Sequence, residues 1–303
     1  MTQQNVKNTA ASVRARLRQK REQTGEDFQT LLTRFGSERL LYRISQSKHS
    51  QDFILKGAAI FLVWTGLPHR PTRDVDLLGS GSKSIKDIQT KFREIISANV
   101  EPDGLIFDIN SVQAERIKED ADYEGVRVKL IAKLESAIIR LQVDVGFGDA
   151  ITPSPDQITY PVLLDFNPPI LRAYNRETVV AEKFQAMVTL GIANSRMKDF
   201  FDIWLLARDF PFHSDPLKNA IKATFKRRKT KIPETPPLAF TKVFIDDSSK
   251  QQQWRAFVKR SRLPTQHMDL NAVINEIAEF ILPVILTFKT SRRWNPGGPW
   301  KAV

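Results

Sequence analysis

The chain has 303 residues, of which 46 are Lys or Arg and 34 are Asp or Glu, so its formal net charge is +12. It contains no cysteine, which excludes disulfides, thiolate nucleophiles and zinc–thiolate sites. Hydrophobic residues make up 41% of the chain, enough to bury a substantial core, which excludes a disordered polypeptide. The basic excess favours a polyanionic partner.

The predicted elements alternate between helices and strands. A basic helix and an amphipathic helix are expected first, followed by a short strand, a turn that opens a helix, and a second short strand. A further helix precedes two alternating segments that form an antiparallel hairpin, and the rest is mainly helical. In chain order the expected ranges are 10–23, 27–46, 53–55, 57–64, 74–78, 84–99, 126–134, 138–147, 176–190, 197–208 and 215–290.

The net charge is concentrated at the two ends of the chain. It is +6 over residues 1–48, −4 over residues 49–209 and +10 over residues 210–303. These parts are therefore expected to have different roles. The apolar run 278–288 has only about half of the roughly 20 residues that a membrane span needs, and the N-terminus lacks the apolar core of a signal peptide. We expect a soluble cytoplasmic protein with no membrane partner.

Three carboxylates form the candidate metal site. Asp74 and Asp76 are two residues apart on a predicted strand, so both lie on one face and repel each other unless a cation compensates. Asp144 lies on the polar face of another strand and could supply a third ligand. Such acids suit Mg²⁺ or Mn²⁺ bound to phosphate oxygens. The alternatives are a solvated strand end for the pair and an outward-facing acid for Asp144.

The turn Lys56-Gly57-Ala58 follows an apolar strand and opens a helix. Small residues let backbone N–H groups approach a phosphate, and the start of a helix favours an anion. The alternative is a tight turn that needs glycine for steric reasons.

A second cluster is expected on the helices at 176–190 and 197–208. Lys183 lies beside an apolar face and could bind a triphosphate or extend its ammonium to the surface. Arg196, Asp199 and Asp202 are spaced by three, which places them on one helix face. Either an intrahelical ion pair or an active-site acid would explain this spacing, and Asp199 and Asp202 are equal candidates for that acid.

Three segments resemble the nucleotidyltransferase family of AbiEii-type toxins, which belong to type IV toxin–antitoxin and abortive-infection systems. They read LKGAAIFLVWTGLPHRPTRDVDLL, LQVDVGFGD and RETVVAEKFQAMVTLGIANSRMKDFFDIWLL, and they occur in the family's order over about residues 50–210. The resemblance implies a DNA polymerase β-like core in which Asp74, Asp76 and Asp144 bind metal. Nucleotide binding is then assigned to Lys56, Gly57, Ala58, Arg73 and Lys183. Ala58 stands where such enzymes commonly have serine.

The resemblance also implies an α+β fold: a nucleotidyltransferase core with a small mixed β-sheet flanked by helices, plus a mainly helical C-terminal part. We divide the chain into a basic helical segment 1–48, the core 49–175, a helical domain 176–290 and a loosely ordered tail 291–303.

The expected activity is transfer of NMP from an NTP to an RNA acceptor, with the 3′ end of tRNA implied by the resemblance. Asp199 and Asp202 join the three metal-binding acids as candidate catalytic residues. The basic ends would hold the RNA backbone, above all through Lys226, Arg227, Arg228, Lys229 and Lys231. A cognate antitoxin, encoded nearby, is a further expected partner. The alternatives are nucleotidylation of a protein hydroxyl, and a non-catalytic module that binds nucleic acid or antitoxin through a decayed site.

Overall fold

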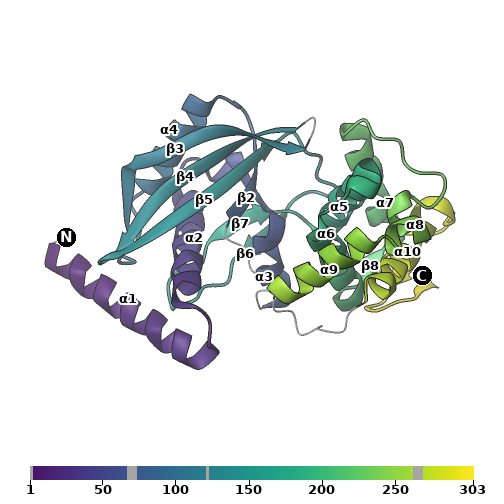
Figure 1. Ribbon diagram of the computed structural model, residues 1–303. Coiled ribbons are helices and arrows are strands. Elements are labelled where there is room, and N and C mark those ends of the chain that lie inside the picture. The colour runs from purple at the N-terminus through teal and green to yellow at the C-terminus, as the bar shows by residue number, and fades with distance from the viewer. Residues whose placement is uncertain (1–2, 67–73, 121–122, 262–268) are drawn as a thin grey trace. The chain divides into compact units, whose positions relative to one another are not determined.

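The chain folds into two compact units (Figure 1). The computed structural model describes residues 3–66, 74–120, 123–261 and 269–303. The first unit comprises residues 1–148 and 156–173, and we call it the sheet unit. The second comprises residues 149–155 and 174–303, and we call it the helical unit.

The described part of the sheet unit forms a seven-stranded mixed sheet in the order β3-β4-β5-β2-β1-β7-β6. β2 is parallel to β5 and β1 is parallel to β7, whereas the other neighbouring strands are antiparallel. This confirms the predicted α+β fold and the hairpin made by β4 and β5. The strands are β1 (Phe53–Lys56), β2 (Asp74–Gly79), β3 (Ile106–Asp120), β4 (Tyr123–Leu134), β5 (Ala137–Phe147), β6 (Asp156–Thr159) and β7 (Ile170–Ala173).

Helices cover one face of this sheet. They are α2 (Phe28–Gln46) and α4 (Ile85–Ile96), and α1 (Gln3–Thr24) packs against α2. The helix α2 packs closely on β5, since a Cβ on Gly36 would lie 3.0 Å from the Ile139 side chain. In α4, the ring of Phe92 lies 5.6 Å from that of Phe53 in β1. Because strand side chains alternate, the polar residues between these apolar positions lie on the opposite face.

A buried charge network holds α2 to the loop before β3. Arg43 donates to both carboxylate oxygens of Asp103 at 2.6 and 3.1 Å, and Arg39 donates to the same carboxylate at 3.1 Å. The Arg39 side chain is fully buried and Asp103 is only 1% exposed. Two cations on one buried carboxylate satisfy its lone pairs, so this basic pair of the N-terminal region is structural.

The helical unit is built mainly from α5, α6, α7, α9 and α10. The ring of Phe184 in α5 packs on Phe225 of α7, with centroids 5.4 Å apart. Phe280 of α10 packs on Phe212 and Trp294. The elements are α5 (Arg176–Leu190), α6 (Met197–Asp209), β8 (Phe212–His213), α7 (Ser214–Arg227), α8 (Lys242–Ile245), α9 (Ser248–Ser261), α10 (Leu270–Leu286), β9 (Arg292–Trp294) and β10 (Trp300–Ala302).

The C-terminal tail differs from our expectation of a loosely ordered segment. Its strands β9 and β10 pair with each other, and β9 also pairs with β8. The indole of Trp294 donates to the Ala207 carbonyl at 2.6 Å, and that of Trp300 donates to the Phe280 carbonyl at 2.9 Å. The buried Trp294 and the half-buried Trp300 thus anchor this Pro- and Gly-rich tail. The four-segment division of the chain remains a prediction.

Candidate active site

A row of charged residues crosses the sheet, one from each of five neighbouring strands. In register these are Lys56 on β1, Asp76 on β2, Asp144 on β5, Arg127 on β4 and Glu115 on β3. Residues paired in this way share one face of a sheet. We call this face, opposite α2 and α4, the charged face. Two of the three predicted metal-binding acids are therefore direct neighbours across the parallel pair of β2 and β5.

A second polar row runs parallel to the first. Asp74 on β2 pairs with Gln142 on β5, which pairs with Lys129 on β4 and, beyond it, Gln113 on β3. Asp74 thus lies on the charged face two residues before Asp76, as the period of a strand requires. The structure brings all three predicted acids to one region of one face.

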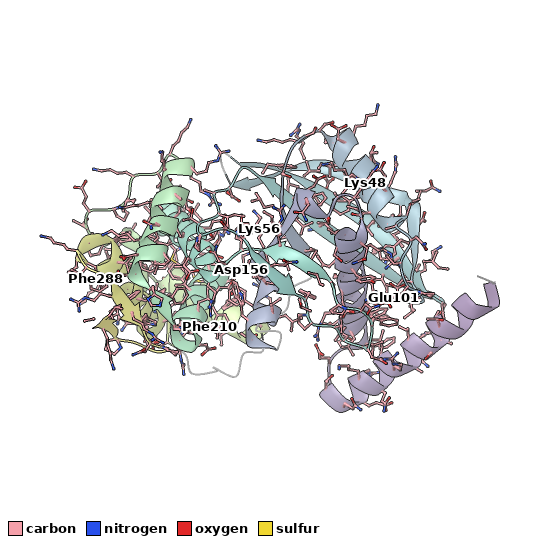
Figure 2. The ribbon with its side chains drawn as sticks, turned by 180° about the vertical axis from the view of Figure 1, so that it is seen from behind. Lys48, Lys56, Glu101, Asp156, Phe210 and Phe288 are labelled. Atoms are coloured by element: carbon pink, nitrogen blue, oxygen red, sulfur yellow. The ribbon has the colours of Figure 1, made fainter. Side chains whose placement is uncertain are left out.

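The turn at Gly57 contacts Asp76 directly. Gly57 has a φ of +73°, which favours glycine, and a Cβ built on it would lie 1.9 Å from Oδ2 of Asp76. Both the backbone conformation and the close approach therefore require glycine. Lys56, which is 7% exposed, ends β1 (Figure 2), and the neighbouring Ala58 is also buried. Arg73 lies outside the described residues, so its predicted role stays a prediction.

Arg127 holds the third acid in a two-point ion pair. Its Nε donates to Oδ1 of Asp144 at 2.8 Å and its Nη2 to Oδ2 at 2.7 Å, while the Gln142 amide donates to Oδ1 at 3.3 Å. Hydrogen bonding to Asp144 raises the pKa of Arg127 above its usual value. Sequence reasoning missed Arg127, although it lies on the polar side of the predicted hairpin. Its register opposite Asp144, which the folded hairpin sets, is what gives Arg127 a role.

The carboxylates of Asp74, Asp76 and Asp144 are chemically suited to bind a divalent cation, but they do not converge on one point. Carboxylate oxygens are the ligands that Mg²⁺ and Mn²⁺ prefer, and Gly57 leaves open the space that a side chain would fill beside Asp76. Within the described ranges, however, no three His, Cys, Asp or Glu side chains form a metal-binding cluster. Asp144 directs both oxygens to Arg127. Arg127 therefore competes with a cation for the oxygens of Asp144.

The second predicted cluster forms a buried ion network in the helical unit. Nζ of Lys183 lies 2.6 Å from Oδ1 of Asp199 and 2.8 Å from Oδ2 of Asp202, and both acids are fully buried. Nε of Arg196 lies 2.7 Å from Oδ2 of Asp199. Burial raises the pKa of Asp199, but the charges of Lys183 and Arg196 outweigh it, so the net shift is downward. Lys183 therefore joins the two candidate acids, which have equivalent contacts with it.

The basic run 226–231 is not uniformly exposed. Lys226, Arg227, Lys229 and Lys231 are exposed, whereas the Arg228 side chain is only 11% exposed. Nη2 of Arg228 lies 3.0 Å from Oδ1 of Asp149, and Nη1 donates to the Gln185 amide at 2.9 Å. This corrects the prediction for Arg228, because its guanidinium is committed to the interior of the helical unit.

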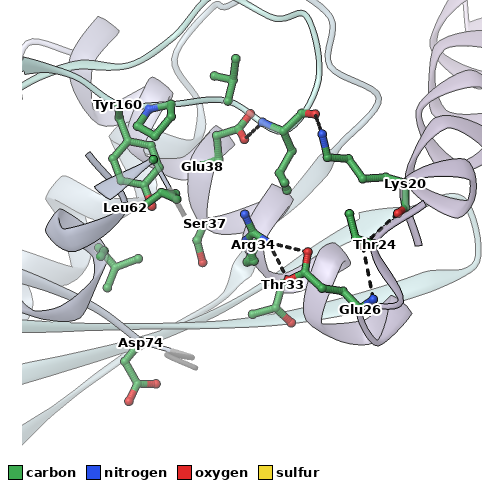
Figure 3. A pocket seen from close by; sticks show the side chains of 16 residues that line it. Lys20, Thr24, Glu26, Thr33, Arg34, Ser37, Glu38, Leu62, Asp74 and Tyr160 are labelled. Atoms are coloured by element: carbon green, nitrogen blue, oxygen red, sulfur yellow. Dashed lines mark hydrogen bonds and ion pairs between the residues drawn. The ribbon is translucent and has the colours of Figure 1, made fainter. Parts of the chain in front are cut away.

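A cavity of about 310 Å³ lies at the start of β2 (Figure 3). Asp74 lines it, together with Glu38 and Arg34 of α2 and Lys20 of α1. Nη1 of Arg34 reaches Glu26 at 2.7 Å and Lys20 donates to the Leu163 carbonyl at 3.2 Å, so both cations already have partners. We call it the helix-side cavity. Nothing in the spacing of these residues along the sequence indicated it.

Comparison with known proteins identifies the family. The sequence pattern of the family described as nucleotidyl transferase AbiEii toxin, type IV TA system, matches residues 39–276, well over half of the chain. The chain belongs to this family. No curated protein matches it.

Two solved structures, both from Helicobacter pylori, are similar to the AbiEii-family chain. One is JHP933, with 17% sequence identity, a TM-score of 0.45, and coverage of 81% of this chain and 88% of that one. The other, described as a candidate nucleotidyltransferase, has the same identity and TM-score and covers 81% of this chain and 90% of its own. No helix in the described part of the AbiEii-family chain has the length and apolarity to cross a membrane.

Proposed function

We propose that this AbiEii-family protein transfers a nucleoside monophosphate from an NTP to an RNA hydroxyl, with the 3′ end of tRNA as the acceptor. The single observation that supports this most is the pairing of Asp76 with Asp144 in register, with the Gly57 turn against Asp76. Carboxylate oxygens are the ligands that Mg²⁺ prefers, and a glycine turn beside them lets backbone N–H groups approach a phosphate bound to the same cation.

In this scheme the acceptor oxygen forms a bond to the α-phosphorus, the bond to the bridging oxygen of the β-phosphate breaks, and pyrophosphate leaves. Asp74, Asp76 and, once released by Arg127, Asp144 would hold Mg²⁺ or Mn²⁺. When bound, the metal would supply positive charge for the phosphates and favour deprotonation of the acceptor hydroxyl. Backbone N–H groups at Gly57 approach the phosphates without an intervening Cβ. Because Ala58 has no hydroxyl, these backbone donors must suffice.

We assign Lys183 to the triphosphate as a point charge, as the resemblance implies. Its ammonium is already held by Asp199 and Asp202, so these acids would position it. The assignment does not depend on choosing between the two acids, because each accepts from the same Nζ.

The direct test is incubation of the protein with Mg²⁺, total tRNA and each α-labelled NTP in turn. Labelled RNA is expected with at least one NTP for the wild type and only background for Asp76→Ala, with matched thermal unfolding of the two proteins as a control for folding. If no NTP gives labelled RNA above the mutant's background, transfer to RNA is excluded.

A non-catalytic module is the second candidate. Two observations favour it: Ala58 replaces a hydroxyl-bearing residue, and Arg127 takes both oxygens of Asp144. Calorimetric titration of NTP with Mg²⁺ separates the two functions. Binding that disappears in Asp74→Ala supports the catalytic site, whereas no binding by the wild type supports the decayed one. If the acceptor is instead a protein hydroxyl, mass spectrometry of a partner will show a gain of nucleotide mass.

The family also implies a cognate antitoxin, which we propose as a partner encoded next to this chain. We place the protein in the cytoplasm, where NTPs and tRNA are available. Induction of the chain alone is expected to arrest growth, and co-expression of the neighbouring reading frame is expected to restore it.

A further inference from the structure

A second hollow opens on the charged face itself and shares one lining residue, Asp74, with the helix-side cavity. It has a volume of about 450 Å³ and includes Asp74 from β2, Gln142 and Arg140 from β5, and Lys129 from β4. We call it the sheet-face groove. Asp74 also lines the helix-side cavity, so one candidate metal-binding acid borders both spaces. A transferase that moves a phosphoryl group in line needs its two substrates to meet from different sides at one centre.

Basic side chains lie in and beside the sheet-face groove, and two of them form no ion pair in the described part of the chain. Arg140 is exposed and, within the part of the chain that the structure describes, its side chain forms no ion pair. Lys133 is also exposed and forms no ion pair in the described part of the chain. It pairs in register with Ile138, so it lies on the same face, diagonally across from Arg140. Lys129 is half-exposed and lies 2.6 Å from Glu115. Positive charge therefore remains available along this strip.

The other groove residues add hydrogen-bonding and apolar surface. Gln113 and Gln142 carry amides that both donate and accept, and Ser111 carries a hydroxyl. Ile138, next to the groove on β5, is 46% exposed. Basic side chains suit phosphates, amides suit base edges, and exposed apolar side chains and guanidinium planes suit base faces. In the helix-side cavity, by contrast, Lys20 and Arg34 already have partners.

We propose that the sheet-face groove binds the acceptor strand, a single-stranded RNA 3′ end, with its backbone along Lys133 and Arg140 and its terminal hydroxyl beside Asp74. This inference rests on the proposed nucleotidyl transfer. The proposed NTP site, at Asp76 and the Gly57 turn, lies on the same face, two residues along β2 from Asp74. The two substrates would thus meet at the carboxylates of Asp74 and Asp76.

The test measures RNA binding without NTP, so that it does not depend on catalysis. A fluorescent single-stranded RNA with a free 3′ end is titrated with the full chain as wild type, with the double variant Arg140→Gln/Lys133→Gln, and with the double variant Lys83→Gln/Lys86→Gln. The control pair is exposed and lies just before and within α4, which covers the opposite face. Both double variants remove two positive charges.

The groove variant is expected to bind RNA at least tenfold more weakly. The slope of log affinity against log salt should become shallower by about 1.4, since each phosphate contact to a single strand contributes about 0.7. The control pair should keep the wild-type affinity and slope. The single variant Arg140→Lys, which keeps the positive charge, should bind RNA more tightly than the groove variant. Unchanged thermal unfolding midpoints show that the variants are folded.

Equal binding by the groove and control variants would overturn the proposal, and so would a wild type that binds no RNA. Loss of modification of a protein acceptor, with RNA binding intact, would assign the groove to a protein instead and overturn it as well. Failure of the proposed function gives a different result: RNA binding depends on Arg140 and Lys133, but no NTP labels the RNA.

Discussion

Arg127 and Asp144 form a two-point ion pair, with N···O distances of 2.8 and 2.7 Å, next to Asp76 on the neighbouring strand. Such a fork is both stronger and more directional than a neutral hydrogen bond. It balances the charge of the third acid, but it also occupies the oxygens that a metal would need. Arg127 therefore sets the cost of assembling the three carboxylates around a cation.

Replacement of Arg127 by Gln is expected to strengthen binding of a divalent cation. Without the guanidinium, Asp144 and Asp76 repel each other across the strand pair, and a cation relieves that repulsion. Mn²⁺ titration followed by electron paramagnetic resonance should show affinity about tenfold higher than that of the wild type. Asp144→Asn should bind more weakly than the wild type. Equal Mn²⁺ affinity in Arg127→Gln and wild type would show that the ion pair does not compete with the metal.

Gly57→Ala should disrupt the candidate site more than its backbone strain alone explains. The new Cβ would meet Oδ2 of Asp76 at 1.9 Å, in addition to the cost of a positive φ. Gly25 provides a matched control, because its φ is +69° and a Cβ there would meet nothing within 4 Å. Gly25→Ala should cost about 1 kcal/mol of unfolding free energy, and Gly57→Ala about 2 kcal/mol more than that. Only Gly57→Ala should lose NTP binding in calorimetry.

Glu38 should make the stability of the sheet unit depend on pH. Burial raises its pKa to about 7 from an ordinary value of 4.5, although a hydrogen bond from the Leu163 amide opposes the shift. Between these two values the folded chain binds more protons at Glu38 than the unfolded chain does. Stability therefore falls as pH rises from about 4.5 to about 7, by an amount on the order of 3 kcal/mol.

Glu38→Gln should remove this contribution, since the amide oxygen still accepts from Leu163 and carries no charge at any pH. Thermal unfolding between pH 4.5 and pH 8 is the measurement. The variant is expected to gain stability relative to the wild type as pH rises. Parallel curves for the two proteins would show that the pKa of Glu38 is the same in the folded and the unfolded chain.

Lys183→Met should destabilise the helical unit strongly. It would leave Asp199 and Asp202 buried without the ammonium that joins them, and a buried acid that loses its partner costs roughly 3–5 kcal/mol. Arg196→Gln is the control, because Arg196 is 35% exposed and is expected to cost less than about 1 kcal/mol. Denaturant unfolding checks this. A stable Lys183→Met protein that still binds NTP would contradict both the structural role of Lys183 and its assignment to the triphosphate.

Substitutions in the basic run 226–231 should distinguish its exposed residues, which we propose bind RNA, from Arg228, which stabilises the fold. Gln at Lys226, Arg227 and Lys229 should weaken RNA modification far more than NTP binding, because salt-sensitive phosphate contacts would be lost. Arg228→Gln should lower the unfolding temperature instead, since Asp149, only 1% exposed, would lose its guanidinium partner. Parallel loss of RNA modification and NTP binding in the triple variant would assign the run another purpose.

The sequence alone determined the local pattern of this protein. Period two predicted that Asp74 and Asp76 share a face and that the β4–β5 hairpin places Asp144 on its polar side, and helical spacing predicted the cluster of Arg196, Asp199 and Asp202. These predictions depend only on residues close in the chain. The edge strand β3 was not among them, because its mixture of polar and apolar residues carries no strong alternation.

Tertiary structure decided which residues meet across the chain. The parallel pairing of β2 with β5 sets Asp76 beside Asp144, and the antiparallel pairing of β4 with β5 brings Arg127 onto that acid. A shift of one residue in either register would turn these side chains to the opposite face. Register between distant strands is set by packing of the apolar face against α2 and α4. The charge of Arg127 therefore became part of the site only through the folded core.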